Sequence, residues 1–137
     1  TPTIASFLEK LDLERVAVSR ALGHPVESTR DWLKRTYHIE GETLYQCLQN
    51  NEAYRRIDAP ATLQHRYLFE DVPCGLVPLE AVGLKFDLDM TYTSLIIDLA
   101  TRLMEVDFRK EGRNLESLGL SCGQNCLLDI LEGEAGS

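Results

Sequence analysis

Apolar residues recur at helical spacing along most of this chain. The first stripe repeats every three or four positions, at Ile4, Phe7, Leu8 and Leu11. Thr1 can cap this segment, and Gly23 before a proline can end it. We therefore expect one long helix over residues 2–22, with Glu9 and Asp12 on its exposed face.

The same periodicity returns in five later segments. They begin at Ser28 and Thr43 and then span residues 79–86, 92–105 and 121–132. We expect Trp32, Leu33 and Tyr37 on the buried face of the second helix. Residues 92–105 carry the clearest apolar stripe, at Leu95, Ile96, Leu99, Leu103 and Met104. Residues 52–65 are predicted to be mostly loop.

No segment alternates apolar and polar residues at a period of two, and no internal repeat is visible. The fold class predicted from these patterns is all-α, a single-domain bundle of six or seven helices. At 137 residues the chain fits one domain with its own core.

Composition and charge exclude several classes of function. The net charge of −8 would repel a phosphate backbone, so nucleic acid is not an expected partner. No apolar run reaches the roughly 20 residues of a membrane span, and no signal-peptide pattern is present. Thr1 opens directly on a helix start without an initiator Met, so we expect a domain of a longer protein.

Four cysteines are scattered along a domain that needs no disulfide for stability, which favours a reducing, cytoplasmic location. Cys122 and Cys126 lie four positions apart, but no second Cys or His pair accompanies them. A zinc site needs about four such ligands, so we expect structural cysteines and no metal.

The densest chemistry lies in residues 65–71. His65, Arg66, Tyr67, Glu70 and Asp71 bring an imidazole, a guanidinium, a phenol and two carboxylates together just before Pro73. A guanidinium can grip a carboxylate with two parallel hydrogen bonds, which suits an acidic small molecule. An aspartate can hold an imidazole in one tautomer and stabilise its protonated form.

Spacing leaves two interpretations of this cluster open. In a continuous α-helix, Arg66 and Glu70 would form a surface i, i+4 ion pair, while Asp71 would diverge from Arg66 by roughly 140°. Alternatively, Pro73 disfavours helix at the residue before it. We then expect the chain to leave the helix near Asp71 and turn that carboxylate back toward Arg66.

Several motifs resemble the C-terminal helical domain of the octopine/nopaline (opine) dehydrogenase family. They lie in family order between about Thr1 and Leu120. The motifs are residues 50–55 (NNEAYR), 57–60 (IDAP), 65–73 (HRYLFEDVP), 75–78 (GLVP) and 107–113 (DFRKEGR). The resemblance implies a helical substrate domain over residues 1–120, followed by a C-terminal helix and tail over residues 121–137.

The resemblance also implies a function. Members of the family condense an amino acid with a 2-oxo acid such as pyruvate and reduce the product with NAD or NADP. It implies that Arg66 grips the oxo-acid carboxylate, that His65 and Tyr67 contribute to substrate binding, and that Asp71 orients a catalytic histidine. The resemblance implies that this histidine comes from a segment before this domain. The cofactor is also expected from elsewhere, because no glycine-rich dinucleotide fingerprint occurs here.

A different class of function remains open from the residues alone. The chain could be a non-enzymatic helical module for dimerisation or peptide binding, with residues 65–71 as surface charge. An apolar helix face left exposed would favour that interpretation. As a dehydrogenase domain, the chain would have the amino acid, the oxo acid and its own N-terminal Rossmann domain as partners, with a homodimer left open.

Overall fold

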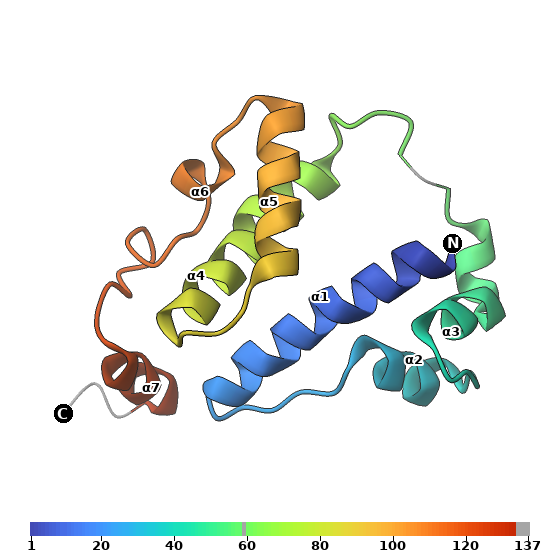
Figure 1. Ribbon diagram of the computed structural model, residues 1–137, viewed down its shortest axis with the longest axis horizontal. Helices are drawn as coiled ribbons and strands as arrows, with labels where there is room; N and C mark the ends of the chain where they lie inside the picture. The colour runs from blue at the N-terminus through green and yellow to red at the C-terminus, as the bar shows by residue number, and fades with distance from the viewer. Residues whose placement is uncertain (59, 134–137) are drawn as a thin grey trace.

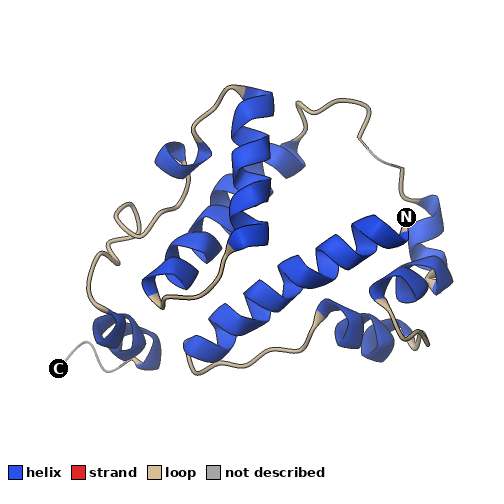
Figure 2. Cartoon of the chain, viewed as in Figure 1, coloured by secondary structure: helices blue, strands red, loops and turns tan. Residues whose placement is uncertain are grey.

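The computed structural model describes residues 1–58 and 60–133, and every regular element within them is a helix (Figures 1 and 2). The α-helices are α1 (Pro2–Ala21), α2 (Thr29–Tyr37), α3 (Leu44–Asn50), α4 (Val77–Lys85), α5 (Thr91–Met104), α6 (Phe108–Glu111) and α7 (Gln124–Glu132). A 3₁₀-helix, η1 (Glu52–Arg56), and a π-helix, η2 (Tyr67–Leu76), complete them. The predicted all-α fold is confirmed. None of these helices is long and apolar enough to cross a membrane.

Helix α1 runs between two packed groups of helices, with α2 and α3 on one side and α4 and α5 on the other (Figure 1). Each group has a hydrophobic cluster of its own. One consists of Leu33, Ile39, Leu44 and Cys47, and the other of Val72, Val77, Ile97, Ala100 and Phe108. The long helix expected over residues 2–22 is therefore the element that joins the two halves of the domain.

Three carboxylates of α1 fasten the two halves by capping other helices. Each accepts backbone N–H groups in the first turn of a neighbouring helix, where those donors have no intrahelical partner. The contacts are Glu9 to Leu44 N at 2.7 Å, Asp12 to Thr29 N at 2.7 Å, and Glu14 to Tyr92 N at 2.7 Å and Thr93 N at 2.8 Å. The prediction that Glu9 and Asp12 only add charge to an exposed face was wrong, because both are partly buried helix caps.

The start signals predicted for the first three helices are confirmed. Thr1 caps α1, Ser28 caps α2, and Thr43 caps α3 within a capping box completed by Gln46. The predicted buried face of α2 is only partly correct. Leu33 is 1% exposed, but Trp32 and Tyr37 are 37% and 39% exposed and pack edge to face against each other.

Helix α5 buries a different face from the one that its leucines suggest. Thr93, Ile97 and Ala100 are at most 3% exposed. Of the predicted stripe, Leu95, Leu99 and Leu103 are more than half exposed, whereas Ile96 and Met104 are partly buried and Met104 packs against the cluster around Phe108. Small side chains at positions 93 and 100 allow neighbouring helices to approach closely. A row of leucines therefore remains on the surface.

The C-terminal segment packs at the end of α4. The side-chain amide of Gln124 in α7 donates to the Lys85 carbonyl at 2.6 Å, and Leu127 is buried. Cys122 and Cys126 form a disulfide, while Cys47 and Cys74 are free. The sequence analysis did not predict this disulfide, which is unusual in the reducing location that it favoured.

Candidate functional site

The cluster at residues 65–71 lies at the start of a helix that continues well beyond it. Arg66 occupies the N-cap position of the π-helix η2 without a capping side-chain hydrogen bond, and η2 passes through Asp71 and Pro73 directly into α4. The prediction that the chain leaves the helix near Asp71 was wrong. A π-helix uses hydrogen bonds from residue i+5 to residue i, is rare, and is frequent at functional sites.

Two prolines explain why this helix is wound more loosely than an α-helix. Pro73 has no N–H for the α-helical bond to Phe69 and would clash with the carbonyl there. Val77 N–H instead bonds the Val72 carbonyl, five residues back. Pro78 likewise offers no donor to the carbonyl of Pro73, and that oxygen accepts the backbone N–H of Arg113 at 2.8 Å.

The π winding changes the relation between the two principal site residues. Where the helix repeats by i, i+5 bonds, a residue five positions on returns to about the same side. Arg66 and Asp71 are five positions apart and both are exposed. No ion pair joins them within residues 1–58 and 60–133. Arg66 instead lies 4.0 Å from Glu70, with side chains 70% and 63% exposed, which is a weak surface pair.

The rings of His65 and Tyr67 lie close together at the residues next to Arg66. The ring of His65 lies 4.4 Å from that of Tyr67, and its Nδ1 accepts the Tyr67 N–H at 3.3 Å. That bond leaves the proton of a neutral ring on Nε2. The Arg66 guanidinium lies 5.9 Å from the centre of the Tyr67 ring, within cation–π range. All three side chains lie near the entry of the helix and are at least partly accessible.

Residues 107–113 pack against η2 and α4. Phe108 is 1% exposed and meets Phe69 edge to face at 5.9 Å between ring centres. Arg109 Nε and Nη2 each donate to one oxygen of Glu80 in α4 at 2.6 Å, and its Nη1 pairs with Asp98 in α5. The charges at 109–113 look like a solvated patch in sequence, so sequence analysis missed this structural role.

The buried carboxylate of this ion pair stays ionised more readily than usual. Burial of Glu80 raises its pKa, but hydrogen bonds from Arg109 and Ser94, together with the charge of Arg109, bring the pKa below its ordinary value of 4.5. The same bonds raise the pKa of Arg109. Glu80 and Arg109 therefore join α4 to the segment after α5 as a charged pair at neutral pH.

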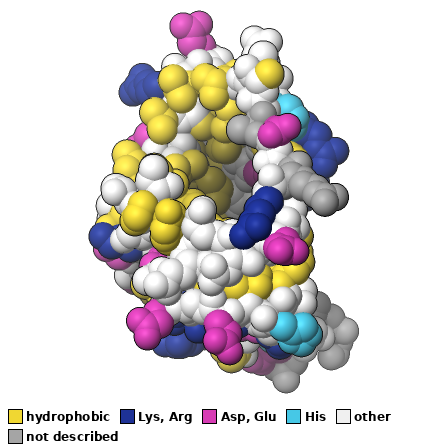
Figure 3. All heavy atoms as spheres, turned by 90° about the vertical axis from the view of Figure 1, so that its right-hand side faces the viewer, with side chains coloured by type: hydrophobic (Ala, Val, Ile, Leu, Met, Phe, Trp, Pro, Cys, Tyr) yellow, Lys and Arg dark blue, Asp and Glu magenta, His cyan; other side chains and the backbone are white. Residues whose placement is uncertain are grey.

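The molecule also carries an apolar cavity of about 290 Å³ between α1, α3 and the η2–α4 junction. Its walls are Leu8, Leu11, Leu44, Leu48, Leu76 and Leu79, with Asp12, Arg15 and Thr29 beside them. Asp12 and Arg15 pair with each other at 2.8 Å, so neither is free for chemistry. Figure 3 shows that the face formed around the N-terminal end of the chain is hollowed and largely hydrophobic inside.

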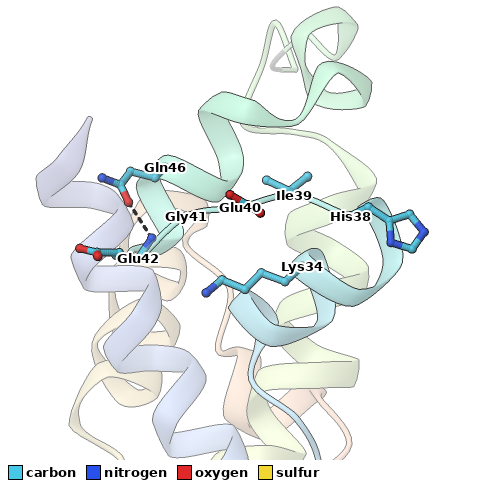
Figure 4. Close-up of a pocket in the computed structure, with 7 residues that line it drawn as sticks. All are labelled: Lys34, His38, Ile39, Glu40, Gly41, Glu42 and Gln46. Carbon is cyan, nitrogen blue, oxygen red and sulfur yellow. Dashed lines mark hydrogen bonds between the residues drawn. The ribbon is translucent and has the colours of Figure 1, made fainter.

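A more open cavity of about 730 Å³ lies between the end of α2 and the start of α3 (Figure 4). Lys34 points toward it, whereas His38 points away. Gln46 Oε1 accepts the Glu42 N–H at 2.7 Å and also the Thr43 N–H at 3.4 Å, the second of which belongs to the α3 capping box. This lining serves the local fold and does not include the residues predicted for catalysis.

The described residues do not fit a metal or a dinucleotide. No group of three or more His, Cys, Asp or Glu side chains is placed to hold a metal ion within residues 1–58 and 60–133. The same ranges contain no β-strand, so they offer no strand–loop–helix phosphate site of the kind that binds NAD. The exposed face of η2 instead offers an accessible guanidinium and two carboxylates.

Comparison with known proteins gives a consistent match. Residues 1–104 match the alpha-helical domain of NAD/NADP octopine/nopaline dehydrogenases. The chain is 44% identical over 121 residues to an opine dehydrogenase of Arthrobacter sp. (strain 1C), covering 88% of this chain and 34% of that protein. Protein ocs of Agrobacterium tumefaciens (strain Ach5) is 26% identical over 133 residues, 96% of this chain and 37% of its own length.

A solved structure of octopine dehydrogenase with NADH and L-arginine has the same fold. It superposes with a TM-score of 0.68 at 20% identity, over 97% of this chain and 40% of the solved chain. The present chain thus spans a little over a third of the length of the relatives that it matches.

Proposed function

This chain belongs to the octopine/nopaline dehydrogenase family through its alpha-helical domain, and from that premise we propose that it is the substrate-binding and catalytic domain of an NAD(P)-dependent opine dehydrogenase. The reaction proposed is the reductive condensation of an amino acid with a 2-oxo acid such as pyruvate. The observation that carries this proposal is the exposed π-helical face bearing Arg66 and Asp71, neither of which has a buried structural partner among the described residues.

The proposal assigns the nucleotide to another part of the enzyme. The residues described here do not fit NAD or NADP, which would be held by an N-terminal Rossmann domain of the same protein. The isolated chain of residues 1–137 is therefore expected to be inactive. We also propose a cytoplasmic location. The free thiols of Cys47 and Cys74 are compatible with it, whereas the Cys122–Cys126 disulfide is unusual in a reducing compartment.

Arg66 is the group proposed to bind the oxo-acid carboxylate. Its side chain is 70% exposed and its contact with Glu70 is long, so an incoming carboxylate competes with a weak partner only. The planar guanidinium can bind that carboxylate through two hydrogen bonds and so fix the orientation of the oxo acid. His65 and Tyr67, on either side of Arg66, are proposed to complete this binding surface.

Asp71 is proposed to act on a histidine that residues 1–137 do not supply. A carboxylate beside an imidazole raises its pKa and fixes its tautomer. The neutral histidine can then take a proton from the substrate amine, which leaves the nitrogen free to attack the carbonyl carbon. The histidine later returns a proton to the departing oxygen.

The experiment that tests the proposal is Arg66→Ala in the complete dehydrogenase. Loss of a charged, bidentate contact should raise the KM for the oxo acid roughly 10- to 100-fold, while the KM for the nucleotide stays near the parent value. Arg102→Ala, which removes an exposed arginine from α5, is the matched control. Parent kinetics for Arg66→Ala would refute the proposed role.

One observation favours a second candidate function. The row of Leu95, Leu99 and Leu103 on α5 is more than half exposed, which is the exposed apolar face expected of an association module. Such a face would serve packing against another region of the enzyme or a homodimer. Sedimentation of the parent and of Leu99→Glu distinguishes the two arrangements. A homodimer through this face would dissociate in the variant and its mass would fall, whereas packing against another region of the enzyme would leave the mass unchanged.

A further inference from the structure

The π-helical turn at Pro73 is held by residues that are distant in sequence. Arg113 N–H donates to the Pro73 carbonyl at 2.8 Å and replaces the donor that Pro78 lacks. Phe108 packs in one hydrophobic cluster with Val72 and Val77, the residues on either side of this turn. The backbone of residues 108–113 therefore contacts η2 at the point where its winding departs from an α-helix.

Gly112 makes this contact possible for a steric reason. Its φ of −79° is available to any residue, so conformational freedom is not what the position requires. A Cβ built here would lie 2.8 Å from the Pro73 carbonyl oxygen, 3.1 Å from Pro73 Cα and 2.5 Å from the Phe108 carbonyl oxygen. All three are backbone atoms. A side chain at position 112 must therefore push the segment away from the turn.

We propose that Gly112 and the backbone N–H of Arg113 are positioning groups that hold the π-turn at Pro73 and thereby set the place of the Asp71 carboxylate relative to Arg66. This inference rests on the proposed function. It adds two residues that touch neither substrate nor cofactor and act through the helix that carries the reacting groups.

The two site residues respond differently to a shift at Pro73. Asp71 lies two positions from the proline, inside the π-helix, whereas Arg66 lies seven positions away at the helix entry. A displacement of the turn therefore moves Asp71 more than it moves Arg66. The expected signature is a change in kcat and in its pH dependence that exceeds the change in the KM for the oxo acid, because misplacement of a catalytic group by about 1 Å can cost roughly 100-fold in rate.

The first test compares Gly112→Ala with Gly83→Ala in the complete dehydrogenase. Gly83 is also buried, but a Cβ there would meet the sulfur of the flexible Met90 side chain and not the π-turn. Both variants should unfold more easily than the parent. Only Gly112→Ala should lower kcat, roughly 10- to 100-fold. It should also displace the acidic limb of the pH–rate profile. Equal profiles for the two variants would mean a merely structural role.

The second test removes the hydrogen bond without adding bulk at position 112, and it replaces the first if Gly112→Ala does not fold. Arg113→Pro deletes the N–H and sets a ring carbon against the Pro73 carbonyl, so it breaks this contact while Gly112 is unchanged, and the ψ of 178° at Gly112 suits a residue before proline. Arg113→Ala keeps the N–H and is the control. Arg113→Pro should show the kcat loss and Arg113→Ala should not.

Two outcomes separate this inference from the proposed function. If Arg66→Ala and Asp71→Asn impair the enzyme while folded Gly112→Ala and Arg113→Pro keep the parent kcat and pH profile, the positioning role is refuted and the proposed function stands. If Arg66→Ala and Asp71→Asn also behave as the parent, the proposed function fails and this inference falls with it.

Discussion

The carboxylate of Glu14 in α1 caps the amino terminus of α5 through Thr93, whose backbone N–H and hydroxyl donate to the same Glu14 oxygen at 2.8 and 2.6 Å. Both residues are buried, and α5 has no capping side chain at its own N-cap residue, Met90. A carboxylate from 79 residues away thus satisfies donors that would otherwise be buried without a partner.

Glu14→Ala should therefore be among the most destabilising single substitutions on α1. It leaves buried N–H donors unpaired, and we expect the free energy of unfolding to fall by about 2 kcal/mol. Denaturant unfolding followed by circular dichroism measures this directly. Glu116→Ala removes an exposed carboxylate and should change the value by less than about 0.5 kcal/mol. Equal effects for the two variants would contradict the capping role.

The ion pair of Glu80 and Arg109 predicts a specific pH dependence of stability. The pKa of Glu80 lies below its ordinary value of 4.5 in the folded protein, so folding favours the ionised carboxylate. This contribution is fully present above about pH 4.5 and is lost as the pH falls through the lowered pKa. Because the guanidinium is 40% exposed, we expect it to be about 2 kcal/mol, below the range for fully buried pairs.

Glu80→Gln tests this dependence. At pH 7 the variant should be less stable than the parent, and the difference should shrink progressively below pH 4.5, since the parent carboxylate becomes protonated there. Urea unfolding midpoints of both proteins at several pH values between 7 and 3 give the difference curve. A difference that stays constant across that range would show that the charge of Glu80 does not contribute.

The sequence predicted those features whose cause lies within a few residues. Ser28 and Thr43 predict the helices that follow them, because the side chain of each capping residue accepts the backbone N–H of the residue three positions later. Glu14 could not be assigned in this way, since its partners lie on another helix. A carboxylate on an amphipathic helix normally indicates the exposed face, and only the tertiary fold turns it inward.

The same limit applies to the candidate site. The residues at 65–71 could be selected from their chemistry, and their place on an accessible face agrees with a binding role. The local rule for Pro73 predicted a helix end. The helix instead continues as a π-helix through Pro73, and the backbone of Arg113, forty residues later, gives the Pro73 carbonyl the donor that Pro78 lacks. That compensation has no local signal, although the glycine at 112 is where a close backbone approach could have been suspected.

If Asp71 orients a catalytic histidine, Asp71→Asn in the complete dehydrogenase should act mainly on kcat. The substitution preserves shape but removes the charge that stabilises an imidazolium, so kcat should fall roughly 100-fold or more. Losing that charge also lowers the pKa of the histidine, so the acidic limb of the pH–rate profile should move to lower pH. The KM for the oxo acid should change less, because Arg66 is untouched.

Glu70→Gln is the matched control for Asp71→Asn. It removes the same charge from the neighbouring position of η2, where Glu70 lies 4.0 Å from Arg66 in an exposed pair. A general electrostatic effect of this helix would move the acidic limb equally in both variants, and the orienting role of Asp71 would then be wrong. A shift confined to Asp71→Asn requires a titrating group beside that carboxylate. No hydrogen bond or ion pair joins a histidine to Asp71 within residues 1–58 and 60–133, so we expect that group in another part of the enzyme, where substitution of its histidines can identify it.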